Sequence, residues 1–196
     1  MKIRLIKGMV LSSMILLLSY GTSSATLIES ETNDSFAVAD TISRGPAIWA
    51  DAGAMELTTG DVDFFSIRLE EGEILMAATT PLAELFTMPD TILGLFDQDG
   101  YLLALNNDAG DGDPGISEDY LGSKIEYQAP TGATYYIGVT GFDDFDFDGN
   151  SDDSENTMAH DKTGAYALTV TVIPEPATLS LFILGLIPLL RRRKST

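Results

Sequence analysis

Alternation with a period of two runs through residues 164–172, GAYALTVTV. Successive side chains of a β-strand point to opposite faces of the sheet, so Tyr166, Leu168, Val170 and Val172 share one face. A helix would instead repeat its apolar positions every three to four residues. The stretch therefore predicts a strand with one buried face.

The same period recurs in the middle of the chain, where Phe65, Ile67 and Leu69 alternate with Ser66 and Arg68. Turn-forming residues, rich in Gly, Asp, Asn and Pro, separate this strand from its neighbours. Further strands are predicted at residues 73–79, 91–96, 101–105, 124–129 and 134–141.

Six to eight short strands without a long amphipathic helix predict an all-β fold, an antiparallel β-sandwich or jelly roll. Short helical turns are expected at residues 35–41 and 82–86, whereas residues 43–58 have no clear place in this fold. The chain has no internal repeat. The 196 residues suffice for one domain of ordinary size once targeting segments are set aside.

The charge of the chain is concentrated by sign. The formal net charge is −19, but seven of the eleven basic residues lie near the two ends. Residues 26–173 hold four basic residues against 29 acids, a net charge of −25. Nucleic acid and anionic lipid select basic surfaces, so neither is expected as a partner of this body, whereas cations are. The chain has no cysteine, which excludes disulfides, thiolate metal sites and thiol catalysis.

The N-terminal residues 1–25 have the order of a secretory signal peptide. Basic residues precede an apolar run from Met9 to Leu18, and small residues lead to Ala25. Cleavage by signal peptidase is expected after Ala25. The alternative is a buried N-terminal helix.

The C-terminal residues 174–196 combine a Pro-Glu-Pro motif, an apolar stretch and a basic cluster. Residues 177–190 would span roughly 21 Å as a helix, less than the ~30 Å of a bilayer's hydrocarbon core. The basic cluster favours the cytoplasmic side, which leaves the acidic body outside. A transient membrane anchor is therefore expected.

These three features resemble the PEP-CTERM sorting signal, over about residues 173–194. The resemblance implies processing by an exosortase, a membrane transpeptidase-like enzyme of Gram-negative bacteria, and delivery to the cell surface or an exopolysaccharide matrix. A plain membrane anchor is the alternative. The residues implied in sorting are Pro174, Glu175, Pro176, Arg191, Arg192 and Arg193.

Residues 28–172 resemble a bacterial pre-peptidase C-terminal (PPC) domain through the order and spacing of several short motifs. The motifs are ESETND at 29–34, GDVDFF at 60–65, LFDQDG at 95–100, ND at 107–108 and YYIGV at 135–139. The resemblance implies a jelly-roll β-sandwich of the kind often appended to secreted proteases. Some related collagenase modules bind calcium and collagen. The sequence departs from the family in an insertion at residues 143–161.

The first of these motifs is a candidate calcium site. Ca²⁺ takes six to eight oxygen ligands, which closely spaced carboxylates and amides can supply. The resemblance implies that this segment meets two aspartates across the fold. The alternative is a solvated acidic linker whose Asn or Asp caps a turn. The candidate ligands are Glu29, Glu31, Asn33, Asp34, Asp61 and Asp63.

A second candidate lies in the insertion, where DFDFDG and a glutamate six residues later satisfy the D-x-[DN]-x-[DN]-G-x5-E calcium-loop pattern. No helix is expected on either side, so the pattern predicts a calcium loop between two strands rather than an EF-hand. The alternative is a disordered acidic loop. The candidate ligands are Asp144, Asp146, Asp148, Asn150 and Glu155.

A third acidic group has two interpretations, a metal site or a turn alone, because Asn, Asp and Gly are also the residues that turns select. Its members are Asn106, Asn107, Asp108, Asp111 and Asp113.

Catalytic motifs are absent from the sequence. His160 is the only histidine and is expected at the surface, and no G-x-S-x-G elbow or phosphate-binding glycine loop occurs. The sequence therefore predicts a non-catalytic surface or matrix protein stabilised by calcium. The alternatives are a polysaccharide- or protein-binding module, with Trp49, Phe142, Phe145 and Phe147 as exposed aromatics, and a two-carboxylate hydrolase.

Overall fold

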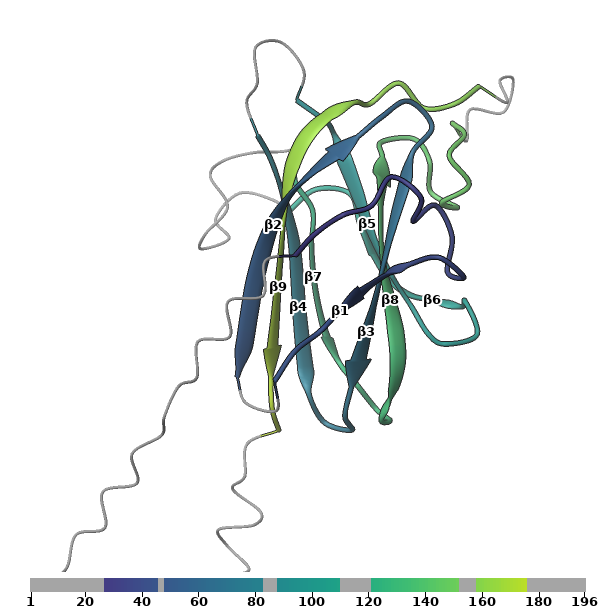
Figure 1. Ribbon diagram of the computed structural model, residues 1–196. Coiled ribbons are helices and arrows are strands. Elements are labelled where there is room, and N and C mark those ends of the chain that lie inside the picture. The colour runs from purple at the N-terminus through teal and green to yellow at the C-terminus, as the bar shows by residue number, and fades with distance from the viewer. Residues whose placement is uncertain (1–26, 46–47, 83–87, 110–120, 152–157, 176–196) are drawn as a thin grey trace, which may run out of the picture.

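The computed structural model describes residues 27–45, 48–82, 88–109, 121–151 and 158–175. Nine strands form within these ranges (Figure 1). They are β1 (Asp40–Ile42), β2 (Trp49–Leu57), β3 (Val62–Leu69), β4 (Ile74–Pro81), β5 (Thr91–Phe96), β6 (Leu102–Asn106), β7 (Lys124–Gln128), β8 (Ala133–Gly141) and β9 (Gly164–Ile173).

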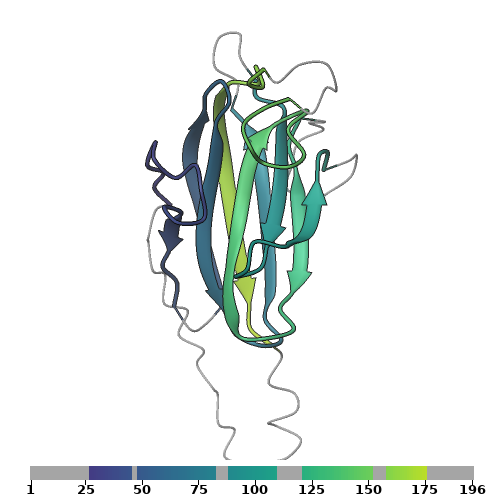
Figure 2. The same ribbon diagram turned by 90° about the vertical axis from the view of Figure 1, so that its right-hand side faces the viewer.

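The strands form two sheets that face each other as a β-sandwich (Figures 1 and 2). The five-stranded sheet has the order β1-β3-β8-β5-β6, and the four-stranded sheet has the order β2-β9-β4-β7. All neighbouring strands are antiparallel except β1 and β3, which pair in parallel. The all-β sandwich predicted from the sequence is confirmed. The described ranges contain no helix long and apolar enough to span a membrane.

The main core fills the space between the sheets. Tyr166, Leu168, Val170 and Val172 of β9 are buried, as their alternation predicts. The facing strand β3 buries Phe65, Ile67 and Leu69 in the same core. Burial of each such side chain stabilises the fold by about 1.5–3 kcal/mol. The period of two in the sequence thus reflects real burial.

Two local predictions are wrong or incomplete. The helical turn expected at residues 35–41 does not persist, because residues 40–42 form β1, whose backbone pairs with the open edge of β3. Residues 49–57, which had no clear place, form β2 and pair along their whole length with β9. Its alternation is hidden by Gly53, where a Cβ would lie 2.3 Å from the carbonyl oxygen of Leu27. The turn expected at 82–86 lies, beyond Leu82, outside the described residues.

A second, smaller core covers the outer face of the five-stranded sheet. We call it the aromatic cluster; it comprises Phe36, Phe64, Phe96, Tyr136 and Phe147. Two segments outside the strands cover it: the lead-in segment, residues 27–39, and the described first part of the loop that follows β8, residues 142–151, which we call the loop after β8. Figure 2 shows the purple lead-in segment beside the strands and the green loop at the top. Strand β9 ends at the end of the sandwich opposite to this loop (Figure 1).

Candidate metal centres

Asp63 is held inside the upper end of the sandwich. It is the second residue of β3, faces the main core, and is only 1% exposed. The hydroxyl of Tyr166 on β9 donates a hydrogen bond to its Oδ2 at 2.6 Å. This bond joins the two sheets. Tyr166 was predicted only as a core residue, and its role here was missed, although a tyrosine at a core position usually needs a polar partner.

Glu29 brings a second carboxyl group to the same place from the lead-in segment. Its Oε2 accepts a hydrogen bond from the backbone N–H of Glu56 at 2.8 Å, and its carboxyl group contacts that of Asp63. Its Oε1 is buried and has no hydrogen-bond partner among the described residues. This oxygen is therefore available to accept a hydrogen bond or to bind a cation.

Asn33 is fully buried, and it pairs with the backbone of Phe64, the residue that follows Asp63. Its side-chain amide donates to the carbonyl oxygen of Phe64 at 3.5 Å, and its own carbonyl accepts from the N–H of Phe64 at 3.0 Å. The side-chain oxygen Oδ1 is buried without a partner in the described part of the chain. Buried amide oxygens are normally satisfied, so this atom calls for a ligand.

Electrostatics of the pair are unfavourable without a counter-charge. Burial, followed by the hydrogen bond with Glu29, raises the pKa of Asp63 to about 10. Burial also raises the pKa of Glu29, and the charges of Glu31 and Asp61 add to this effect. A divalent cation would neutralise both carboxylates and use the unpartnered oxygens, and hard cations prefer such ligands. Glu29, Asn33 and Asp63, which we call the lead-in group, therefore supply the oxygen ligands that a calcium ion prefers.

The other predicted ligands of this site are placed differently. The Oδ2 of Asp61 accepts hydrogen bonds from the backbone N–H and hydroxyl of Thr58, at 2.9 and 3.2 Å, and so closes the turn before β3. Glu31 and Asp34 are exposed to solvent. The fold thus brings Glu29 into contact with Asp63 and buries Asn33 against Phe64, the residue after Asp63.

The loop after β8 gathers Asp144, Asp146 and Asp148, which we call the loop group. One carboxylate oxygen from each lies within 4.8 Å of the others. Oxygens that bind one Ca²⁺ at 2.3–2.6 Å are separated by at most about 5 Å, so this spacing fits a single ion. Asp146 and Asp148 are exposed, whereas Asp144 is buried.

Asp144 organises this loop by itself. Its Oδ1 accepts from the N–H of Asp148 at 3.1 Å, and its Oδ2 accepts from the N–H of Gly149 at 2.9 Å and the hydroxyl of Thr140 at 2.6 Å. A carboxylate has about four acceptor positions, so one remains for a cation. Gly149 has φ 82°, a conformation that glycine adopts without strain.

The remaining predicted ligands of the loop are less defined. The backbone N–H of Asn150 donates to Oδ1 of Asp148 at 2.8 Å, which keeps Asn150 next to the loop group. Glu155 lies outside the described residues, so its closing role stays a prediction.

The third acidic group is described only at Asn106, Asn107 and Asp108. Oδ1 of Asn106 accepts from the N–H of Lys124 at 2.9 Å and so links β6 to β7. The side-chain amide of Asn107 donates to Asp108 at 3.2 Å. Asp90, which was not predicted, lies near Asp108, and burial followed by that charge raises its pKa to about 6. Asp111 and Asp113 lie outside the described residues.

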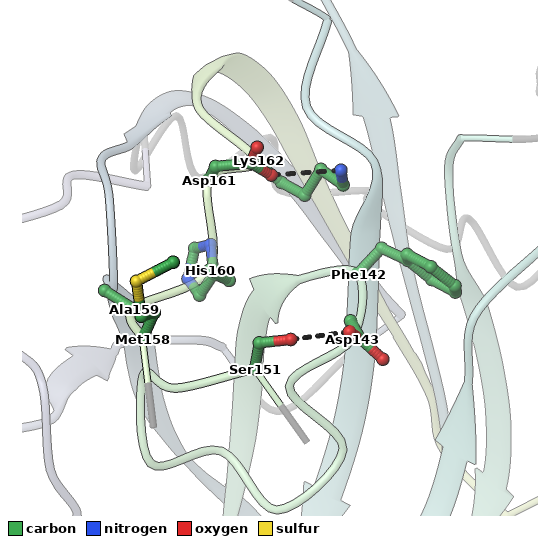
Figure 3. Close-up of a pocket in the computed structure, with 8 residues that line it drawn as sticks. All are labelled: Phe142, Asp143, Ser151, Met158, Ala159, His160, Asp161 and Lys162. Atoms are coloured by element: carbon green, nitrogen blue, oxygen red, sulfur yellow. Dashed lines mark hydrogen bonds and ion pairs between the residues drawn. The ribbon is translucent and has the colours of Figure 1, made fainter. Parts of the chain in front are cut away.

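His160 is buried, at 2% exposure, which corrects the expectation of a surface histidine. It lines a cavity of about 250 Å³ together with Phe142, Asp143 and Ser151 (Figure 3). Its Nε2 donates to the carbonyl oxygen of Asp61 at 2.9 Å, whereas the hydroxyl of Ser151 donates to Asp143. The histidine and the serine therefore have different partners and do not form a nucleophile–base pair.

The aromatic residues expected at the surface are mostly buried. Trp49 and Phe147 are inside the main core and the aromatic cluster, so neither can stack on a sugar. Phe145 is 39% exposed and lies edge-to-face with Phe142, with ring centroids 6.1 Å apart. Of the four predicted aromatic residues, only Phe142 and Phe145 are outside the two cores.

The predicted sorting residues are only partly described. Pro174 and Glu175 follow β9, and the side chain of Glu175 lies against Gly72 in the β3–β4 turn. Ala25, Pro176, Arg191, Arg192 and Arg193 lie outside the described residues.

No protein-family model matches the chain, and no curated protein matches it. Several solved structures are similar at low sequence identity. The pre-peptidase C-terminal domain of a collagenase from Bacillus anthracis has 14% identity and a TM-score of 0.41, over 67% of this chain and 93% of that one. It is a domain of the kind that the motifs of residues 28–172 resemble.

Two further similar structures are bacterial proteins of other descriptions. PliG of Aeromonas hydrophila, a periplasmic inhibitor of g-type lysozyme, has 9% identity and a TM-score of 0.39, over 69% of this chain and 94% of that one. CorA, a surface-associated copper-binding protein of Methylomicrobium album BG8, has 11% identity and a TM-score of 0.41, over 69% and 98%. Similarity at this level carries no argument about ligands or activity.

Proposed function

We propose that this protein is an exported, non-catalytic component of the cell surface or exopolysaccharide matrix whose β-sandwich is stabilised by calcium. Calcium would be held by the lead-in group and the loop group. Its role would be structural: it would neutralise clustered carboxylates and fix the two segments that cover the aromatic cluster. A cation that binds only the folded chain stabilises it by mass action.

The unpartnered buried oxygens of the lead-in group carry this proposal. Glu29 Oε1 and Asn33 Oδ1 are buried acceptors without donors in the described chain, and Glu29 contacts the buried carboxyl group of Asp63. An unsatisfied buried polar group costs about 1–3 kcal/mol. A calcium ion would satisfy both oxygens and the charge at once, whereas a shared proton would satisfy only the pair of carboxyl groups.

The absence of a catalytic pair supports a non-catalytic role. Within the described ranges, His160 and Ser151 have separate partners, and the three carboxylates of the loop group converge on one another rather than across a cleft. Glycosidases need two carboxyl groups about 5–9.5 Å apart on either side of a substrate. The loop group is suited to a cation instead.

The arrangement of the two ends is consistent with surface display. Strand β9 ends at the end of the sandwich opposite to the candidate metal centres (Figure 1). If the C-terminal segment is handled at a membrane by an exosortase, the acidic end points away from the anionic lipid surface. This orientation avoids like-charge repulsion.

Calorimetric titration of calcium into the purified protein, with thermal melts alongside, tests the proposal. Saturable binding and a raised Tm are expected. Glu29→Gln/Asp63→Asn should remove one class of binding and Asp146→Asn/Asp148→Asn the other. Glu126→Gln, which neutralises an exposed acid on β7, is the control for loss of an acid outside both groups. A titration without binding heat and a melt indifferent to calcium would refute the proposal.

The sorting part of the proposal needs a separate experiment. The chain with Pro174→Ala/Glu175→Gln, expressed in a host that has an exosortase, should remain in the membrane fraction, whereas the unaltered chain should reach the surface. Gln128→Ala, at the same end of the sandwich, is the control. Equal surface delivery of all three chains would refute the sorting role of Pro174 and Glu175 and leave only the proposal of export.

A second candidate function is binding of polysaccharide or protein at the aromatic pair Phe142 and Phe145, of which Phe142 is half-buried and Phe145 is exposed. The edge-to-face pair at the surface favours it. Glycan-array binding that is lost in Phe145→Ala would support this candidate.

A further inference from the structure

The two candidate metal centres share a hydrogen-bonded bridge. The carbonyl oxygen of Asp61, two residues before Asp63, accepts from Nε2 of His160 at 2.9 Å and lies 3.2 Å from Oγ1 of Thr140. The same hydroxyl lies 2.6 Å from Oδ2 of Asp144. A hydroxyl carries one hydrogen, so Thr140 shares it between the nearer acceptor, Asp144, and the more distant Asp61 carbonyl.

The backbones of the two regions also touch. His160 donates its N–H to the carbonyl of Gly149 at 3.2 Å and accepts at its own carbonyl from the N–H of Gly60 at 3.1 Å. A Cβ at Gly149 would lie 2.4 Å from the carbonyl oxygen of Gly60. The turn before β3 and the loop after β8 are therefore packed with no room for a side chain between them.

The aromatic cluster provides a second connection. Phe36 belongs to the lead-in segment, and its ring centroid is 4.5 Å from that of Phe64 and 5.2 Å from that of Phe96. Phe147 belongs to the loop, and its ring is 6.5 Å and 5.1 Å from the same two partners. Both covering segments thus pack on the same two rings.

Glycines make the close approach of Phe147 possible. A Cβ at Gly94 of β5 would lie 2.6 Å from its ring. A Cβ at Gly138 of β8 would lie 3.1 Å from the same ring. The loop therefore fits over the sheet in one position.

We infer that cation binding at the lead-in group is coupled to closure of the loop after β8. The inference rests on the proposed calcium binding and adds its regulation. A cation at Glu29, Asn33 and Asp63 fixes the lead-in segment and the start of β3. Through the Asp61 carbonyl and Phe64, the same event holds Thr140, His160 and the loop in place. Coupling is reciprocal, so a closed loop also strengthens cation binding at the lead-in group.

The test separates this effect from any ion that the loop binds itself. In Asp146→Asn/Asp148→Asn the loop loses two of its three carboxylates, while the lead-in group and the bridge remain. Calcium is then titrated while amide hydrogen exchange is measured at Gly149, whose N–H donates to Asp144. We expect calcium to slow this exchange by between about 5-fold and 150-fold, the usual range of coupling between sites.

Two further variants in the same background locate the path. Thr140→Val removes the bridging hydroxyl and should reduce or abolish the slowing, whereas Thr140→Ser keeps the hydroxyl and should retain it. Exchange at Val170, in the middle of β9, shows that each variant is folded. Glu29→Gln/Asp63→Asn should abolish both calcium binding and the slowing.

The outcomes distinguish the inference from the proposed function. Calcium binding at the lead-in group with unchanged exchange at Gly149 would overturn the coupling and leave the proposed function intact. Slowing that persists unchanged in Thr140→Val would overturn the bridge as its path. No calcium binding in any variant or in the unaltered chain would overturn both.

Discussion

The lead-in group and the loop group are both acidic, but they differ in how their oxygens are satisfied. In the loop group, Asp144 receives three hydrogen bonds from within its own neighbourhood, and the other two side chains are exposed. In the lead-in group, Asp63 is buried, Glu29 is half-buried, and two oxygens have no partner in the described chain. Solvent screens the charges of the first group more than those of the second. A cation should therefore matter more for stability at the lead-in group.

The largest expected loss of stability comes from a change in the aromatic cluster, on which both regions pack. Phe147→Ala removes a buried ring from the aromatic cluster and should lower the free energy of unfolding by about 3 kcal/mol. Phe145→Ala, two residues away and partly exposed, should cost less than about 1 kcal/mol. Chemical denaturation of both variants measures the difference. Equal losses would show that the loop does not stabilise the cluster.

Asp63→Asn should change stability in opposite directions with and without calcium. In calcium at about 100 times its Kd, the variant should lose roughly 3 kcal/mol of ligand-derived stability. In EDTA it should melt at a higher temperature than the unaltered chain at pH 7, because it no longer buries an acid whose pKa is raised. Thermal melts in both buffers measure this. A Tm in EDTA below that of the unaltered chain would show that burial of the Asp63 carboxyl group does not destabilise the fold.

Asp146→Asn/Asp148→Asn should have a smaller effect, because both side chains are exposed. We expect calcium affinity at the loop to fall, while the free energy of unfolding in EDTA changes by less than about 1 kcal/mol. Calorimetry and denaturation together measure both quantities. A loss in EDTA as large as that of Phe147→Ala would mean that the carboxylates hold the loop without metal.

The smallest effect is expected at Asp90, a partly exposed acid outside both groups. Its pKa in the folded chain is raised to about 6, above the ordinary value of 3.8. Its contribution to stability is therefore complete below pH ~4 and is lost as the pH rises through 6. Asp90→Asn should remove this pH dependence and stabilise the protein at pH 7 by less than about 1 kcal/mol, because solvent screens the charge.

Denaturation of Asp90→Asn and the unaltered chain at pH 4, 6 and 8 measures that difference. Parallel pH profiles would show that Asp90 does not titrate in this range, and would weaken the contrast between screened and unscreened acids.

The sequence by itself determined the all-β sandwich, most of its strands and the loop group. Alternation is local, so β3 and β9 could be read from their own residues, and a calcium-loop pattern places Asp144, Asp146 and Asp148 together within one turn of chain. Strand β2 escaped prediction because Gly53 occupies an inward position where Leu27 approaches the backbone. That constraint comes from a residue far along the chain.

Only the tertiary structure decided which polar side chains of the lead-in segment turn inward. Asn33 and Asp34 are neighbours of similar chemistry, yet Asn33 is buried and Asp34 is exposed, because Asn33 pairs with Phe64 across the fold. The same holds for Tyr166, which reaches Asp63 from the other sheet, and for His160, which is buried between the turn before β3 and the loop after β8. Burial and partner choice depend on chain segments 31 to 103 residues apart, and no local pattern encodes them.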